Sequence, residues 1–157
     1  MGYALQPLLR IRLMRENRAG VELVAARQAR EDAETKLEAR RSELALYEKT
    51  REERRDRIYD AIIGRPISRD RLDLASEGVA RIDAEGALRV DNVKRAEQDV
   101  KERVEQEAGA RSRLNFATKE RMKIDEHRQV WVAADAAEQE FRAENELEDF
   151  MIRKQEI

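Results

Sequence analysis

Cysteine is absent from the 157-residue chain, histidine occurs once, proline twice, and aromatic residues make up only 4%. The absence of cysteine excludes disulfides, thiolate metal sites and cysteine nucleophiles. A lone histidine, His127, cannot form a histidine-rich metal site. Leu (13), Ile (9), Val (9) and Phe (3) number 34 residues. That is too few for an ordinary globular core, because buried apolar area must offset the entropy lost when a chain is ordered.

Long apolar runs and an excess of positive charge are also missing. No apolar run approaches the roughly 20 residues that span a bilayer. Four arginines among the first 18 residues interrupt any signal-peptide block, and Gly2 is not followed by the Ser or Thr of a myristoylation motif. The net charge of −2 argues against a nucleic-acid binder, which usually carries a strong basic excess. We therefore expect a cytoplasmic protein with no nucleic-acid partner and no direct membrane insertion.

Five residue types dominate what is there. Arg (25), Glu (23), Ala (22), Leu (13) and Lys (7) supply 90 of the 157 residues. This bias is typical of long helices and coiled coils. Disorder is the competing interpretation of such a composition. The small net charge and the periodic spacing of the apolar residues favour helices.

Structure-breaking residues are sparse. Pro7 stands where a helix can begin, because proline in the first turn loses nothing by lacking an N–H. Gly64 suits the residue that follows a helix, and Pro66 prevents continuation. Ser68 can cap a following helix, with Asp70 in its first turn. The sequence thus predicts two helical arms separated by a turn.

The predicted first arm runs over about 7–63, the turn over about 64–68 and the second arm over about 69–155. Glycine costs about 1 kcal/mol in a helix interior. Gly78 and Gly86 lie close together, so we expect the stretch 72–88 to bend, to fray or to form a separate short helix.

Apolar residues recur at steps of three and four, the spacing of a coiled-coil seam. In the first arm these are Ala19, Leu23, Ala26, Ala33, Leu37, Leu44, Tyr47, Ile58 and Ala61; in the second they are Val79, Ile82, Val93, Val100, Val104, Leu114, Met122 and Ile124. Arginines also occupy seam positions and are expected to weaken the seam; they are Arg30, Arg40, Arg51, Arg54 and Arg111.

A short connection favours an antiparallel hairpin, in which paired positions have numbers that add up to about 133. The rival is a parallel homodimer with no pairing within the chain. We expect an all-α fold, a single long antiparallel two-helix coiled-coil hairpin over residues 1–157.

No catalytic, cofactor or metal site is expected. The sequence holds no Gly-x-Gly-x-x-Gly or Walker-type loop that would cradle a phosphate. Asp and Glu are so abundant that pairs of them are best interpreted as solvated partners of arginine. An enzyme needs a water-excluding pocket, and a two-helix rod has no interior to provide one.

Two surfaces are candidates for binding partners. Around the turn, apolar residues either close the hairpin as a small hydrophobic cluster or form an exposed contact surface. The expected binding residues at this tip are Tyr59, Ile62, Ile63, Ile67 and Leu72.

The second surface is the open end of the hairpin. The second arm is the longer, so the segment after about residue 128 has no partner in the first arm. Residues 135–157 carry eight acidic and three basic side chains, whereas residues 1–18 carry four Arg and one Glu. The segment is either an amphipathic docking helix or packs against Leu5, Leu8, Leu9 and Ile11. The expected binding residues at this end are Leu8, Arg10, Arg12, Arg15, Arg18, Phe141, Glu144, Leu147, Glu148, Phe150 and Met151.

The N-terminal motif Tyr-Ala-Leu-Gln-Pro-Leu-Leu-Arg-Ile-Arg at residues 3–12, followed by Arg15, Arg18 and Ala19, resembles the start of the YscO-like proteins of type III secretion systems. The flagellar counterpart is the FliJ-like export protein. The chain length, the break in mid-chain and Trp131 are also similar. The resemblance covers the whole chain in architecture and about the first 20 residues as a motif.

This resemblance implies a part like the central stalk of a rotary ATPase. The open end of the hairpin would sit in the pore of the hexameric secretion ATPase and stimulate its assembly or hydrolysis. The other end would reach the export-gate membrane protein, and export chaperones are further partners of the family. The implied location is cytoplasmic, peripheral to the secretion apparatus at the inner membrane. The alternatives are a generic coiled-coil adaptor, a secretion chaperone that binds through its tip or C-terminal helix, and a secreted component of the machine.

Overall fold

The computed structural model describes residues 2–155, without the side chains of residues 149, 150 and 152–155. Two helices make up nearly all of this range. Helix α1 spans Gln6–Asp60 (55 residues) and helix α2 spans Arg69–Gln155 (87 residues). No strand occurs among residues 2–155. The prediction of an all-α fold with two long helical arms is confirmed.

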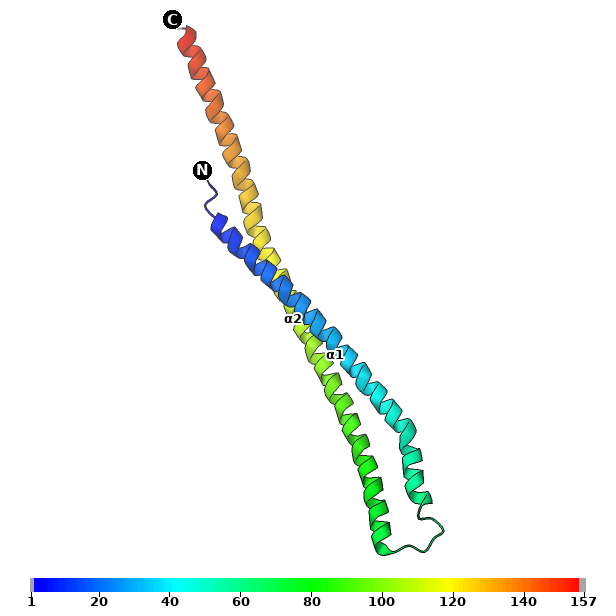
Figure 1. The fold of residues 1–157 in the computed structure, drawn as a ribbon. Coiled ribbons are helices and arrows are strands. Elements are labelled where there is room, and N and C mark those ends of the chain that lie inside the picture. The colour runs from blue at the N-terminus through cyan, green and yellow to red at the C-terminus, as the bar shows by residue number, and fades with distance from the viewer. Residues whose placement is uncertain (1, 156–157) are drawn as a thin grey trace. The chain divides into compact units, whose positions relative to one another are not determined.

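The two helices pack against each other in antiparallel order (Figure 1). The chain divides into two units, one formed by residues 24–109 and one formed by residues 1–23 and 110–157. The first unit holds the turn and the adjoining parts of both helices. The second holds the start of α1 and the C-terminal part of α2. Because the helices pair within the chain in each unit, the antiparallel hairpin is confirmed.

The register follows from contacts between the helices. In the first unit, the Tyr47 hydroxyl bonds to the carbonyl of Ile82, and Arg27 forms an ion pair with Glu107. In the second unit, Glu22 forms an ion pair with Arg113. The residue numbers of these pairs add up to 129, 134 and 135. The predicted value of about 133 therefore holds in each unit.

The turn begins where α1 ends at Asp60. The N–H groups of Ile62 and Ile63 both donate to the carbonyl of Tyr59, at 2.9 Å each. Gly64 then adopts a φ of 74°, a left-handed conformation that favours glycine. At the start of α2 the N–H of Arg71 donates to the Ser68 hydroxyl at 3.4 Å, so Ser68 is the predicted cap.

The buried core is thin. Its seven hydrophobic residues are Leu9, Ala19, Leu23, Ala33, Tyr47, Ile82 and Ala110. Five of them were predicted as seam residues, and Leu9 and Ala110 were not. The seam assignment is wrong at Ala61, Val104 and Met122, whose side chains are exposed.

Arginines in the seam reach across to carboxylates of the other helix. Arg30 lies 2.8 Å from Glu107, and Arg54 donates to Glu85 at 2.9 Å. Arg51 donates to Asp83 at 2.7 Å. Each such pair is partly exposed, so each is individually weak. The expectation that these arginines only weaken the seam is therefore incomplete, because they also link α1 to α2.

Helix α2 is continuous between residues 72 and 88, so the expected fraying or separate short helix is wrong. The two glycines make room for large α1 side chains instead. A Cβ on Gly86 would lie 3.2 Å from a ring carbon of Tyr47, and one on Gly78 would lie 3.1 Å from the Ile58 methyl. The cost of glycine in a helix is offset here by close packing of α1 on α2.

Candidate functional site

The N-terminal segment extends the helix pairing beyond the start of α1. The Tyr3 hydroxyl lies 2.8 Å from Nδ1 of His127 and 3.4 Å from the carbonyl oxygen of Ile124. The Tyr3 ring lies 5.5 Å from the ring of Trp131, centroid to centroid. His127 is exposed, and nothing in the sequence indicated a partner for it. The start of the chain thus covers α2 as far as Trp131.

The four N-terminal arginines fall into two classes. Arg12 lies 3.3 Å from Glu120 across the helix pair, and Arg18 donates to Glu22 at 3.2 Å within its own helix. Arg10 and Arg15 are exposed and form no ion pair with any residue among 2–155 whose side chain is described. Of the four, only Arg10 and Arg15 therefore lack an ion-pair partner among the described side chains.

Acidic side chains anchor this end of α1 to α2. Glu16 accepts bonds from the Arg121 guanidinium and the Thr118 hydroxyl, each at 2.8 Å. A bond from Lys123 at 2.7 Å lowers the pKa of the Glu120 carboxyl, and the charge of Arg12 lowers it further. The ion pair between Arg12 and Glu120 therefore persists below neutral pH. Arg12 serves the contact between the helices rather than a partner.

The C-terminal part of α2 keeps its apolar side chains in solvent. Phe141 is 63% exposed, Leu147 62% and Met151 66%. Glu144 and Glu148 are also exposed, and the side chain of Phe150 lies outside the described residues. Their exposure shows that Phe141 and Leu147 do not pack against the N-terminal leucines, of which Leu8 is half-buried and Leu9 is buried. The packing alternative is therefore wrong for these two residues.

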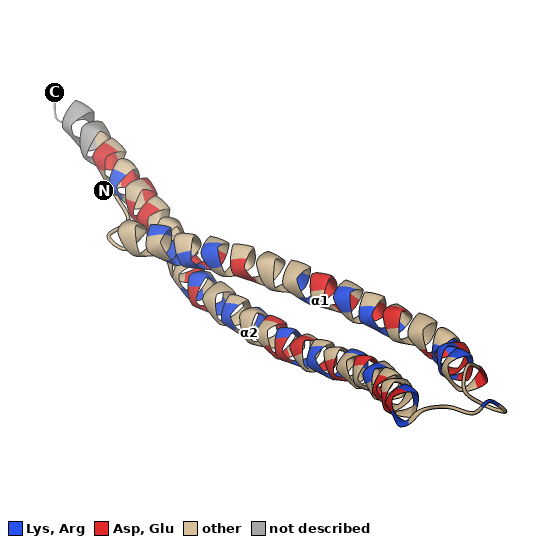
Figure 2. Cartoon of the chain, turned by 60° about the horizontal axis from the view of Figure 1, so that its bottom comes forward, with Lys and Arg blue, Asp and Glu red and all other residues tan. Residues whose placement is uncertain are grey.

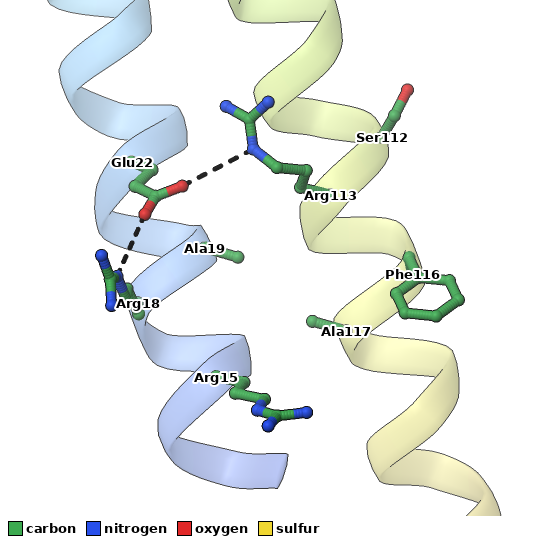
Figure 3. A pocket seen from close by; sticks show the side chains of 8 residues that line it. All are labelled: Arg15, Arg18, Ala19, Glu22, Ser112, Arg113, Phe116 and Ala117. Atoms are coloured by element: carbon green, nitrogen blue, oxygen red, sulfur yellow. Dashed lines mark hydrogen bonds and ion pairs between the residues drawn. The ribbon is translucent and has the colours of Figure 1, made fainter. Parts of the chain in front are cut away.

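A groove of about 440 Å³ runs between the start of α1 and the middle of α2 (Figure 3). Its floor holds Ala19 and Ala117, which point toward each other, with Arg113 on one side and Arg15 on the other. Phe116, 65% exposed, forms one wall. Its further lining residues are Arg18, Glu22 and Ser112. Three arginines against one glutamate make the groove basic with an apolar floor.

The sequence reasoning missed Phe116 and Arg113. A signal was available in the spacing, since Phe116 falls two residues after Leu114 and therefore on another face of the helix. A large aromatic residue outside the seam has no place in a two-helix core. Such a residue is a candidate for binding a partner.

The tip is partly closed and partly exposed. Ile62 and Ile67 are half-buried, whereas Tyr59 is 39% and Ile63 68% exposed. Leu72 is 50% exposed. Two grooves flank Ile62, one of about 520 Å³ that reaches Ile58, Leu74 and Gly78, and one of about 400 Å³ that reaches Tyr59, Leu72 and Val79. The apolar residues around the turn thus close the hairpin and also leave an exposed surface.

Among the residues that the structure describes, no group of His, Asp and Glu could hold a metal ion. Within the same residues, neither helix has a stretch apolar enough to cross a membrane. Lys and Arg alternate with Asp and Glu along both helices (Figure 2).

The comparison with known proteins gives one result. No curated protein and no solved structure matches the chain significantly. The sequence model of the family described as "Type III secretion protein YscO" matches residues 5–153. This range takes in α1, the turn and all but the last two residues of α2, and it agrees with the resemblance of the N-terminal motif. The chain therefore belongs to the type III secretion protein YscO family.

Proposed function

We propose that this chain is a non-enzymatic central stalk and regulator of a type III secretion export ATPase. The end that holds the start of α1 and the C-terminal part of α2 inserts into the pore of the hexamer. The tip around the turn contacts the export-gate membrane protein. In this role the chain acts in the cytoplasm, beside the secretion apparatus at the inner membrane.

The observation that carries the proposal is the charge placement in one unit of the molecule. Arg10 and Arg15 are exposed and form no ion pair with the described side chains, and Glu144 and Glu148 are exposed on the part of α2 that lies beyond α1. A stalk in a ring needs contacts that form and break as nucleotide states change. Exposed ion pairs are worth about 0–1 kcal/mol each, so no single one would trap the stalk. Both signs of charge at one end support this kind of contact.

The tip supports the second half of the proposal. Ile63 and Leu72 are exposed there, beside the two grooves that flank Ile62. Apolar surface that is exposed at a turn and carries no partner within the chain is suited to a protein contact.

Hydrolysis by the cognate ATPase, measured with and without the chain, tests the ATPase contact. We expect the wild-type chain to stimulate hydrolysis and the double variant Arg10→Glu/Arg15→Glu to lose most of the stimulation. The matched control is Arg65→Glu/Arg69→Glu, which makes the same change of charge at the turn. Equal stimulation by both variants, with unchanged helical circular dichroism, would contradict the proposed insertion.

An adaptor that binds through its tip is the second candidate, and the exposed Ile63 and Leu72 favour it. The two candidates differ in what the ATPase assay gives. An adaptor would leave hydrolysis unchanged and bind the export gate or an export chaperone in a pull-down that Ile63→Asp abolishes. Stimulation of hydrolysis that survives Ile63→Asp supports the stalk.

A further inference from the structure

Exposed apolar side chains are unevenly distributed along the two helices. The register places residues 25–58 of α1 beside residues 75–115 of α2, and we call these two stretches the middle segments. They contain 13 large apolar residues, of which only four are exposed, namely Leu46, Leu88, Val90 and Val104. The rest of the chain contains 25 such residues with described side chains, and 17 of them are exposed. Apolar surface is therefore concentrated at the tip, residues 59–74, and in residues 5–24 and 116–151.

The charges of the middle segments are balanced and partly used within the chain. The two segments together carry 18 basic and 18 acidic residues, and both signs alternate along the helices (Figure 2). Arginines of α1 form ion pairs with carboxylates of α2. The pairs are Arg30 with Glu107, Arg41 with Glu97, Arg51 with Asp83 and Arg54 with Glu85. The middle segments thus offer a partner little apolar surface and no excess of one charge, the two features that favour protein contacts.

The length of the middle segments is fixed by helix geometry. At 1.5 Å per residue, the 34 residues of 25–58 span about 50 Å of α1. Contacts between the helices, such as the packing of Tyr47 against Gly86, hold α1 beside α2 within this length. Because each residue of a hydrogen-bonded helix adds the same rise, the paired helices do not stretch or shorten appreciably. Such a structure is suited to spacing two contact surfaces rather than to binding a partner itself.

We infer that the middle segments are a spacer, and that secretion depends on their length and not on their surface. The inference rests on the proposed function, in which the tip contacts the export gate and the other unit contacts the ATPase. In the assembled apparatus both partners are held in place, so a chain of the wrong length cannot engage both at once. In solution the separate partners are free to move, so each contact forms whatever the length of the spacer.

Deletion of one heptad from each helix shortens the spacer and keeps the register. Residues 35–41 and 93–99 lie opposite each other, because paired residue numbers add up to 134 in this part of the chain. Seven residues make about two turns, so the faces of each helix stay aligned across the deletion. The deletion removes the pair of Arg41 and Glu97 as a whole and removes no buried core residue. It shortens the spacer by about 10 Å, and duplication of the same two segments lengthens it by as much.

Secretion by cells that carry each variant in place of the wild-type chain tests the spacer. We expect both length variants to stimulate the cognate ATPase and to bind the cytoplasmic part of the export-gate protein in solution as the wild type does, but to lose most of the secretion. Circular dichroism checks that each variant is helical. The matched control keeps the length and changes exposed side chains of the same two segments, with Lys36→Ala, Glu38→Ala, Lys94→Ala and Arg95→Ala combined. It should secrete as the wild type does.

Three results would overturn the inference and leave the proposed function in place. The first is normal secretion by a helical length variant that is active in both solution assays. The second is loss of secretion by the full-length control, because the surface of the middle segments would then bind a partner. The third is a helical length variant that loses either activity in solution, which would place part of that contact in the middle segments. A wild-type chain that neither stimulates the ATPase nor binds the export gate would instead contradict the proposed function, and the spacer with it.

Discussion

The two units of the molecule hold their helices together differently. In residues 24–109 the helices approach closely, because Gly78 and Gly86 admit Ile58 and Tyr47 of α1. In residues 1–23 and 110–157 no such approach occurs at Gly20, beside which a Cβ would meet nothing within 4 Å. Packing there rests on the buried Leu9, Ala19, Leu23 and Ala110 and on ion pairs, and α2 keeps large apolar side chains exposed. The two units thus differ in how their helices meet, through large side chains set against glycine in one and through mostly small buried residues and ion pairs in the other.

Tyr47 is the residue on which the close packing depends most. Its ring is buried against Gly86 and lies 4.2 Å from the Arg89 guanidinium carbon, and its hydroxyl donates to the Ile82 carbonyl. Truncating a buried aromatic residue typically costs about 3–5 kcal/mol. We expect Tyr47→Ala to lower the free energy of unfolding by about 3 kcal/mol in urea titrations followed by circular dichroism. Leu46→Ala is the control, because Leu46 is 66% exposed and its loss should cost little. Equal losses of unfolding free energy for Tyr47→Ala and Leu46→Ala would contradict the dependence of the close packing on Tyr47.

Glycine-to-alanine substitutions should have opposite signs in the two units. Alanine favours a helix by about 1 kcal/mol over glycine, so Gly20→Ala, with open space around it, should stabilise the chain by up to that amount. At Gly86 the added methyl would stand 3.2 Å from the ring of the buried Tyr47, whose hydroxyl is bonded to the Ile82 carbonyl. We expect Gly86→Ala to destabilise the chain by about 1 kcal/mol because overpacking outweighs propensity. Thermal melts of the two variants and the wild type measure whether each substitution raises or lowers the stability. Stabilisation by both substitutions would contradict the difference in helix packing between the two units.

How far the sequence predicted the fold depended on the kind of signal. Gly64 and Ser68 act locally, and the structure has them as the sequence predicted, one at a φ of 74° and the other as a helix cap. Gly78 was misjudged because its role depends on Ile58, which lies twenty residues away across the turn. Periodicity reports which face is buried, but not how close the neighbouring helix comes.

The candidate binding surface was predicted less completely. Phe141 and Leu147 were named from their spacing and are exposed. Arg12 and Arg10 looked alike in sequence, yet only Arg12 has an acid opposite it on α2. Whether an arginine forms an ion pair with α2 depends on the register between the helices to within one residue. The spacing of the seam residues does not define the register that precisely.

Trp131, the single tryptophan, reports on the unit that holds the chain's N-terminal segment. Tyr3 covers its ring at 5.5 Å, so Tyr3→Ala should expose the indole and shift its emission to longer wavelength. The cost in stability should be small, below about 1 kcal/mol, since one hydrogen bond and a part-exposed ring contact are lost. Tyr3→Phe keeps the ring and is the control for the hydroxyl. An emission spectrum unchanged by Tyr3→Ala would contradict packing of the N-terminal segment on α2.

The smallest expected difference is in the response of the two units to acid. A bond from Arg54, on the opposite helix, lowers the pKa of the Glu85 carboxyl below its usual value of 4.5. The stabilisation that the bond between Arg54 and Glu85 provides is therefore present above pH 4.5. It is lost as the pH falls through the lowered pKa of Glu85. Glu120 also has a lowered pKa, but its first cause is Lys123 of its own helix.

Protonation of Glu85 thus removes a link between helices, whereas protonation of Glu120 mainly removes a contact within α2. Glu85→Gln should lower the urea midpoint at pH 7, and its difference from the wild type should shrink once the pH is well below 4.5. Glu120→Gln should show the same trend with a smaller amplitude, because only the contact with Arg12 joins the helices there. A larger effect at Glu120 than at Glu85 would contradict this order. It would mean that ion pairs contribute more to the stability of the helix pair in residues 1–23 and 110–157 than in residues 24–109.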